Sequence, residues 1–293
     1  MRWAEVAVEA TGESLDAVAN ILIEEGCGGA AAVGSSACVL GKTVRVLGYL
    51  PVDDTLEDRL NSVRERVGQL RELGLELGSD EVGVKWVEDD EWRDGWKEFF
   101  KPVRIGRIVV KPSWEDYRAG PEDVIVELDP GMAFGTGYHP STRLCLLALQ
   151  DCIAGGETVL DVGTGSGILA IAGVKLGAAK AVGLEVESSA VETARANVEN
   201  EDLCDRIEIR QGDSPAVFDG TVEVVVANIV ANVILEMAND LCAKVAPGGK
   251  LITSGIVNDR ASEVAEKLKA AGVRTVEIRQ DGEWTALISE KAV

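Results

Sequence analysis

The sequence contains little of what a metal site requires. It has one histidine, His139, among 293 residues, and none of its six cysteines forms a Cys-x-x-Cys pair. Zinc sites are usually built from such pairs and from several histidines, so we expect no metal. Cysteines scattered in this way, in a chain without a signal peptide, indicate reduced thiols in a cytoplasmic protein.

Long apolar runs are also absent. Charge-free segments such as residues 224–235 are much shorter than the stretch of about 20 apolar residues that spans a bilayer. Near the start of the chain, Glu5 and Glu9 interrupt the apolar stretch that a signal peptide needs. We therefore expect a soluble protein that does not interact with membranes.

Basic residues are scarce relative to acidic ones. The chain has 29 lysines and arginines against 50 aspartates and glutamates, a net charge of -21, and no basic run. Proteins that grip nucleic acids neutralise phosphates with lysine and arginine, so direct binding to DNA or RNA is not expected. A basic protein or a cationic group is the more natural partner.

Residues 1–85 predict a small α+β domain. Strands and helices are expected, in chain order, at residues 3–10, 14–26, 29–34, 42–50, 55–74 and 81–89. The order strand, helix, strand, strand, helix, strand is that of a ferredoxin-like fold. A fold of this kind says little about function by itself.

Residues 86–120 are interpreted as a linker. Trp92, Trp96, Phe99 and Phe100 recur at helical spacing. Their rings are expected to pack a linker helix against the next domain. The alternative is an aromatic surface that touches a substrate.

Residues 121–293 alternate between strand and helix patterns. Strands are expected at residues 158–163, 179–186, 206–212, 222–229 and 250–256. Two further alternating runs are joined by Asp281 and Gly282, a strong hairpin signal. The pattern predicts a parallel α/β sheet that ends in antiparallel strands.

The segment "LDVGTGSG" runs from a predicted strand into a predicted helix. Gly163, Gly165 and Gly167 let the backbone turn tightly and approach a ligand closely. The helix that starts near Ile168 presents free N–H groups to a negative group. The run "GSGILA" also matches a dinucleotide fingerprint, so a nicotinamide or flavin site is the competing interpretation.

Acidic residues and the terminal strands favour a methyl donor over a dinucleotide. Asp161 precedes the first glycine by two residues, where a carboxylate would meet a cationic ammonium. Glu185 suits a ribose diol in either class, and Asp213 would lie beside the adenine. An antiparallel final strand is expected in S-adenosylmethionine-dependent methyltransferases and not in dinucleotide domains. We therefore predict a Rossmann-like, seven-stranded class I methyltransferase domain, although each acidic residue alone is more often a cap or a solvated strand end.

The segment "LDPGMAFGTGYHPST", residues 128–142, is expected to form a lid over the donor-binding edge. Thr142 would lie in the first turn of the following helix, with its hydroxyl able to reach the cofactor. Alternatively, Ser141 and Thr142 are N-cap residues of that helix. His139 is expected to make a structural hydrogen bond, since no carboxylate or cysteine nearby in sequence marks it as a catalytic base.

Four segments together resemble one family. They are "LDPGMAFGTGYHPST", "VLDVGTGSGILAIAGVKLGA", "VVVANIVANVI" and "GEWTALI", and they are similar to the methyltransferases of ribosomal large-subunit protein L11, the PrmA family. The resemblance covers residues 86–293, and residues 1–85 only by predicted fold and position. It implies a cytoplasmic enzyme that uses S-adenosylmethionine to methylate lysine side chains and the N-terminal amine of L11. The amino-terminal domain would recognise the substrate.

The resemblance also implies roles for individual residues. Thr142, Gly163, Glu185 and Asn228 are the positions expected to bind the methyl donor, in addition to Asp161, Gly165 and Asp213. Asn228 would also be catalytic, because its carbonyl oxygen can accept N–H bonds from the amine and fix the lone pair. The alternative for Asn228 is a turn residue at the end of a strand.

Two other functions remain open at the level of sequence. The chain could methylate another basic protein or a small amine. It could also be a regulator that binds the donor without turnover, in which case the ferredoxin-like domain would serve as a dimeric sensor.

Overall fold

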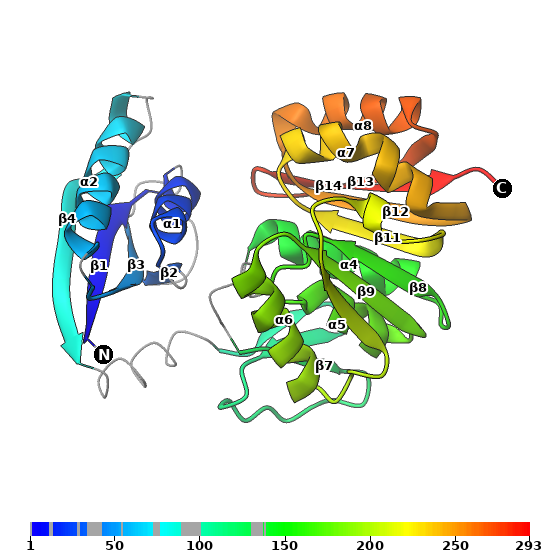
Figure 1. Cartoon of the computed structure of the whole chain (residues 1–293), viewed down its shortest axis with the longest axis horizontal. Helices are drawn as coiled ribbons and strands as arrows, with labels where there is room; N and C mark the ends of the chain where they lie inside the picture. The colour runs from blue at the N-terminus through cyan, green and yellow to red at the C-terminus, as the bar shows by residue number, and fades with distance from the viewer. Residues whose placement is uncertain are drawn as a thin grey trace. The chain divides into compact units, whose positions relative to one another are not determined.

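The computed structural model separates the chain into an amino-terminal unit, Met1–Lys101, and a carboxy-terminal unit, Pro102–Val293. Figure 1 shows both units coloured along the chain. The structure describes residues 2–11, 14–27, 30–33, 43–53, 55–72, 77–88, 101–129, 137 and 139–293. The aromatic run that contains Trp92 and Trp96 lies outside these ranges.

The amino-terminal unit is an antiparallel sheet with two helices. Its elements are β1 (Arg2–Ala10), α1 (Leu15–Glu24), β2 (Ala30–Val33), β3 (Val44–Pro51), α2 (Leu56–Glu72) and β4 (Leu77–Glu88). The strand order is β2-β3-β1-β4, and every neighbouring pair is antiparallel. Val6 and Val8 of β1 are fully buried in a core with both helices, whereas Glu9, the residue after Val8, is exposed. The predicted ferredoxin-like fold is confirmed.

The carboxy-terminal unit contains a seven-stranded mixed sheet. Its strands are β8 (Thr158–Val162), β9 (Lys180–Glu185), β10 (Ile207–Gln211), β11 (Val222–Asn228), β12 (Val245–Val257), β13 (Val273–Asp281) and β14 (Trp284–Lys291). The order is β10-β9-β8-β11-β12-β14-β13. The last strand, β14, inserts between β12 and β13 and is antiparallel to both, while the other pairs are parallel. The predicted class I methyltransferase fold is confirmed.

Helices cover both faces of this sheet. They are α4 (Pro140–Cys152), α5 (Ile168–Leu176), α6 (Ser188–Asn200), α7 (Ala231–Lys244) and α8 (Ala261–Ala270), with the short helices η2 (Pro215–Val217) and η3 (Asn258–Arg260). Val159 of β8 joins the core built by α4, α5 and α6, and its neighbour Leu160 joins the core built by α7 and α8. Consecutive residues of a strand point to opposite faces, so a strand apolar throughout serves two cores.

A second, three-stranded sheet belongs to the carboxy-terminal unit. It consists of β5 (Val103–Ile105), β6 (Ile108–Lys111) and β7 (Val124–Glu127), with β6 antiparallel to β5 and parallel to β7. Ile108 and Val126 are fully buried in the core that contains α4, α5 and α6. These three strands were not predicted from the sequence.

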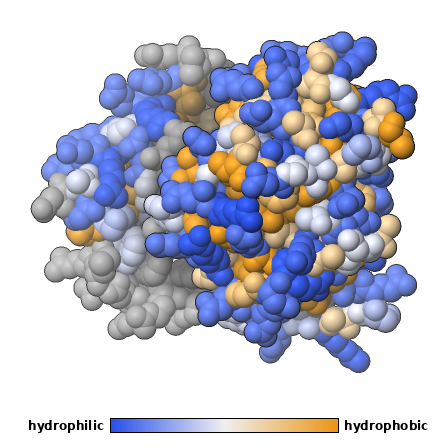
Figure 2. Space-filling view, turned by 45° about the vertical axis from the view of Figure 1, so that its right-hand side comes forward, coloured by the Kyte–Doolittle hydropathy of each residue, from blue (hydrophilic) through white to orange (hydrophobic). Residues whose placement is uncertain are grey.

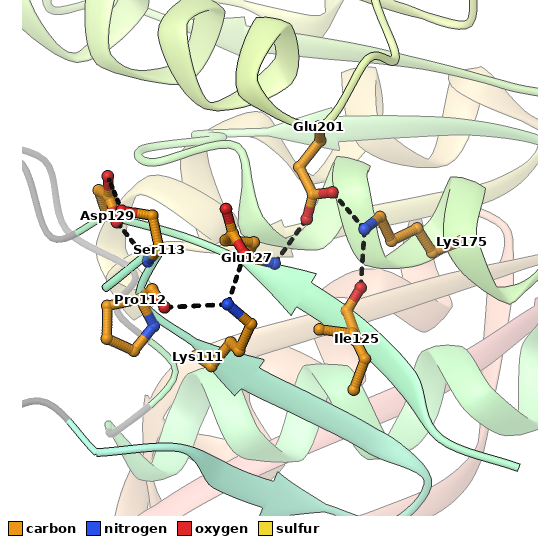
Figure 3. Close-up of polar contacts among 8 residues, drawn as sticks. All are labelled: Lys111, Pro112, Ser113, Ile125, Glu127, Asp129, Lys175 and Glu201. Carbon is orange, nitrogen blue, oxygen red and sulfur yellow. Dashed lines mark hydrogen bonds and ion pairs between the residues drawn. The ribbon is translucent and has the colours of Figure 1, made fainter. Parts of the chain in front are cut away.

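An ion-pair cluster holds β7 against the helices, as Figure 3 shows. Lys175 of α5 donates to the carbonyl oxygen of Ile125 at 2.7 Å and pairs with Glu201. Glu201 also accepts from the backbone N–H of Glu127 at 2.5 Å. The side chain of Glu127 pairs with Lys111 of β6 at 2.5 Å. The cluster thus ties β6 and β7 to α5 and to the end of α6.

Within the described ranges, no helix combines the length and apolar character needed to cross a membrane. Figure 2 shows a surface on which hydrophobic residues are interspersed with hydrophilic ones. The large hydrophobic residues with the most exposure include Trp86 of β4, at 61%, and Val230, at 63%, immediately before α7.

Candidate active site

The glycine-rich segment joins β8 to α5 through a turn that glycine adopts without strain. Gly163, Gly165 and Gly167 have φ values of +73°, +54° and +84°, in the left-handed region that side chains disfavour. A Cβ atom on Gly163 would lie 2.4 Å from Cγ2 of Ile229, which follows β11. Gly163 is therefore required for the close packing of the β8 and β11 loops.

Asp161 is fully buried near the carboxyl end of β8. Its Oδ2 accepts hydrogen bonds from the Thr164 hydroxyl at 2.5 Å and from the Ala170 N–H at 3.2 Å. Its Oδ1 is buried and has no partner among the described residues. Burial raises the pKa of Asp161 to about 7, opposed by the bonds from Thr164 and Ala170 and supported by the charge of Glu185. A cationic group at Oδ1 would stabilise the ionised form.

Glu185 ends β9 and lies against the glycine-rich turn. Its Oε2 accepts from the N–H of Gly165 at 2.9 Å. Its Oε1 accepts from the N–H groups of Val186 and Glu187, at 2.8 and 3.2 Å. An ionised carboxylate offers about four acceptor positions, so these three bonds leave capacity for one further donor, such as a hydroxyl group.

Asn228 and Thr142 are 86 residues apart in sequence and are in contact in the structure. The Nδ2 of Asn228, the last residue of β11, donates to the hydroxyl of Thr142 at 3.1 Å. Thr142 lies in the first turn of α4 and is fully buried. The carbonyl oxygen of Asn228, Oδ1, is buried without a partner among the described residues.

Three buried side-chain oxygens have no partner among the described residues, on Asp161, Asn228 and Thr253. Those of Asp161 and Asn228 lie on the same face of the sheet. Asp161 is aligned with Val226 of the neighbouring strand β11, and Asn228 is two residues further along. Side chains two residues apart on a strand share a face. Both residues face α4 and α5, since Asp161 bonds to Ala170 and Asn228 bonds to Thr142. The fold thus assembles two polar side chains at the carboxyl ends of the central strands.

The sequence allowed Ser141 and Thr142 as N-cap residues of α4, and the structure shows a different cap. The N-cap is His139, and neither Ser141 nor Thr142 caps the helix. Nδ1 of His139 accepts from the Ser141 N–H at 3.2 Å and lies 2.7 Å from the Ser141 hydroxyl. Its ring packs edge-on against Trp284 at the start of β14, with 4.7 Å between ring centroids. The prediction of a structural hydrogen bond for His139 is confirmed.

Asp213 lies two residues after the end of β10, the strand that pairs with the one carrying Glu185. The N–H of Gly212 donates to the backbone carbonyl of Glu185 at 2.9 Å, and the Asp213 side chain is exposed. Residues 130–136 and 138 of the expected lid lie outside the described residues. The structure therefore brings Asp161, Gly163, Gly165 and Glu185 together, with Thr142 and Asn228 as a second group and Asp213 at the rim.

One residue that shapes the site was not recognised in the sequence. Gly255, within β12, has a φ of +79°, and a Cβ atom there would lie 2.4 Å from the carbonyl oxygen of Ile229. Ile229 is thereby packed between Gly163 and Gly255. An isolated glycine within a strand pattern often marks such a close approach and was the available signal.

These groups fit S-adenosylmethionine. The donor carries an ammonium group, ribose hydroxyls and a sulfonium cation. The buried Oδ1 of Asp161 suits the ammonium, and the remaining acceptor capacity of Glu185 suits a hydroxyl. The N-terminus of α5, with Gly167 as its N-cap, offers N–H groups to the donor carboxylate.

The chain is similar to known proteins over nearly its full length. The profile of the family "Ribosomal protein L11 methyltransferase (PrmA)" matches residues 2–292. A ribosomal protein L11 methyltransferase of Alkaliphilus oremlandii is 37% identical over 309 residues, covering 99% of both chains. One from Clostridium botulinum is 42% identical over 251 residues, covering 85% of this chain and 80% of its own. A crystal structure of ribosomal protein L11 methylase from Lactobacillus delbrueckii subsp. bulgaricus, at 30% identity, superimposes with a TM-score of 0.62 over 66% of this chain and all of its own.

The matches extend through both units, including residues 1–85, which contain none of the four motifs that carry the resemblance. They confirm the predicted methyltransferase activity and the predicted methyl donor, S-adenosylmethionine. The dinucleotide and non-catalytic interpretations are not supported. This chain belongs to the ribosomal protein L11 methyltransferase (PrmA) family.

Proposed function

We propose that this chain methylates amino groups of ribosomal protein L11, at lysine side chains and at the N-terminal amine. The observation that carries the proposal is the carbonyl oxygen of Asn228, which is buried without a described partner at the carboxyl end of β11. A buried acceptor in this position suits a nucleophile that carries N–H groups. Asn228 would be the catalytic residue that contacts the amine.

The residues proposed to hold the donor surround the loop between β8 and α5. They are Asp161, Gly163, Gly165, Glu185 and Asp213. Thr142 and Asn228, which the resemblance also places at the donor, are proposed to lie on the side where the amine enters. The bound donor supplies an electrophilic methyl group on a sulfonium cation. Asp161 would pair with a cation through Oδ1, and Glu185 would accept from hydroxyl groups while its bond to Gly165 keeps the turn in place.

The amine must be neutral to react. A lysine with a pKa of ~10.4 is only about one-thousandth neutral near pH 7.4. Removal from water and a neighbouring cation both lower that pKa, so the site needs no dedicated base. The contribution of Asn228 is orientation: its carbonyl accepts an N–H of the amine and directs the lone pair, an effect worth several kcal/mol in such reactions.

The charge of the chain supports a basic protein substrate. With 50 acidic and 29 basic residues, its net charge is -21. Ribosomal proteins are generally basic, so long-range attraction would speed their encounter with this chain. We assign substrate recognition to residues 1–85. Next to them, Trp86 is 61% exposed, and exposed tryptophan is enriched where protein partners bind.

A cytoplasmic location is part of the proposal. Five cysteines of the described part of the chain are free: Cys27, Cys145, Cys152, Cys204 and Cys242. Free thiols at scattered positions persist in reducing compartments, where ribosomal proteins are also made.

The test is mass spectrometry of purified L11 after incubation with this protein and S-adenosylmethionine. We expect L11 to gain several methyl groups, at lysines and at its N-terminus. The Asn228→Ala variant should bind the donor in calorimetry and transfer methyl groups about 10- to 1,000-fold more slowly.

Two controls separate this function from its alternatives. A second basic ribosomal protein, supplied at the same concentration, should remain largely unmodified. Methylation of free lysine or of a small amine at the rate found for L11 would contradict the proposed substrate. Equal rates for Asn228→Ala and the wild-type protein would remove Asn228 from the amine site.

A further inference from the structure

We infer that Thr142 is a positioning residue, whose hydroxyl holds the Asn228 amide so that its carbonyl oxygen faces the substrate amine. The inference rests on the proposed function of Asn228. It gives Thr142 a role different from donor binding, which is the role that the family resemblance implies. The two roles predict different measurements.

The hydrogen bond itself is the first observation. Nδ2 of Asn228 donates to Oγ1 of Thr142 at 3.1 Å, while Oδ1 of Asn228 is buried without a partner in the described structure. One end of the amide is therefore bonded to the protein, and the other has no hydrogen-bond partner among the described residues. An amide rotated by half a turn would present two N–H donors in place of the acceptor. Such an amide could not accept an N–H from an amine.

The hydroxyl of Thr142 is not needed to begin the helix. His139 caps α4, and its Nδ1 accepts from the N–H of Ser141. Thr142 is nonetheless fully buried, at 0% exposure. A buried hydroxyl that does not cap the helix and bonds to a side chain from another element points to a role in fixing that side chain.

The position of Thr142 is set by a well-packed helix. The following residues of α4, Leu144, Cys145 and Leu146, are buried in the core shared with α5 and α6. Asn228 is held equally firmly, because the N–H of Ile229 beside it donates to the carbonyl oxygen of Ser254 at 3.2 Å. Two ordered backbones thus hold the hydroxyl and the amide within hydrogen-bond distance.

The experiment uses the full-length protein and the variants Thr142→Val and Thr142→Ser. Valine has nearly the shape of threonine and lacks the acceptor, whereas serine retains it. The first readout is the NMR signal of the Asn228 side-chain amide, assigned by its loss in Asn228→Ala. We expect it to shift or broaden in Thr142→Val and to return near its original position in Thr142→Ser.

The second readout separates orientation of the amine from donor binding. In Thr142→Val we expect kcat for L11 to fall about 10- to 100-fold. The affinity for S-adenosylmethionine, measured by calorimetry, should change less than about threefold. Thr142→Ser should recover most of kcat. In the Asn228→Ala background, Thr142→Val should cause no further loss, because the two residues act as one unit.

Three outcomes would overturn the inference. The first is an unchanged Asn228 signal and wild-type kcat in Thr142→Val. The second is a loss of donor affinity as large as the loss of kcat, which would make Thr142 a donor contact. The third is an additive loss in the double variant. If valine prevents folding, as judged by circular dichroism, Thr142→Ala provides the same comparison with a smaller side chain.

Failure of the proposed function gives a different pattern. If Asn228→Ala retains wild-type turnover, Asn228 does not orient the amine. The NMR signal would then still report whether Thr142 holds the amide. The structural link and its catalytic use are thus tested separately.

Discussion

Two regions of the carboxy-terminal unit differ in how their polar side chains are paired. In the cluster of Figure 3, Lys175 and Glu201 bond to each other, and each also bonds to the backbone of β7. At the carboxyl ends of β8 and β11, by contrast, Asp161 and Asn228 each keep one buried oxygen without a partner among the described residues. Both regions lie within one folded unit, so the difference is local.

The difference separates structural polar groups from groups kept for a ligand. A buried polar atom without a hydrogen bond costs about 1–3 kcal/mol, so most such atoms in folded proteins are paired. Where a buried polar atom lacks a hydrogen bond at the end of a sheet at which ligands bind, a bound ligand is the simplest partner for it. The paired cluster should therefore matter for stability, and the partnerless oxygens of Asp161 and Asn228 for binding and turnover.

The largest expected effect comes from placing a side chain in the glycine-rich turn. A side chain at Gly163 would be strained at φ +73° and would lie 2.4 Å from Ile229. We expect Gly163→Ala to lose about 2–5 kcal/mol of stability and Gly163→Val to abolish donor binding. Gly156→Ala is the matched control, because Gly156 has a φ of +94° with open space around it. Equal losses in urea unfolding for both alanine variants would show that strain alone, without the contact with Ile229, explains the effect.

A second effect follows from the raised pKa of Asp161. The folded-state pKa is about 7, against 3.8 as the reference for the unfolded chain. Between these values the folded protein holds a proton that the unfolded chain has released, so stability falls as pH rises. The effect of this group is complete above pH 7 and is on the order of 4 kcal/mol at most. We expect Asp161→Asn to lack this decrease and to be more stable than wild type at pH 8.

Urea unfolding of both proteins between pH 4 and 8 measures this difference. Asp213→Asn, which changes an exposed aspartate, is the control and should keep the wild-type pH dependence. Binding of S-adenosylmethionine should release a proton near pH 6.5, detected by calorimetry in buffers of different ionisation enthalpy. Binding heats that do not depend on the buffer would contradict a cation at Asp161.

A smaller effect is expected in the paired cluster. Glu201→Ala removes the partner of Lys175 and the acceptor for the N–H of Glu127. We expect a loss of about 1–3 kcal/mol in stability, since two polar groups lose their bonds, with donor affinity unchanged. Glu199→Ala, an exposed position on α6, is the control. A donor affinity that falls in proportion to stability would mean that the cluster and the site are coupled, and the distinction between the two regions would fail.

Much of the fold and part of the site were accessible from the sequence. Strand and helix patterns predicted β8 to β14, since each rests on short-range periodicity and turn residues. Asp161 and Glu185 were recognisable because they lie at or near the ends of two consecutive predicted strands, and Gly163 and Gly165 because they form the turn after the first of them. The strands β5 to β7 escaped prediction because they are only three or four residues long, and β5 and β6 also belong to the segment interpreted as a linker.

The sequence alone determined where the chain turns, which strands are buried on both faces and which loop is rich in glycine. These properties depend on residues within a few positions of one another. Tertiary structure decided that β14 inserts between β12 and β13, that His139 caps α4 beside Trp284, and that Thr142 meets Asn228 across 86 residues. It also decided which oxygens remain without a partner. Pairing of that kind depends on which distant segments pack together, and no local pattern of residues specifies it.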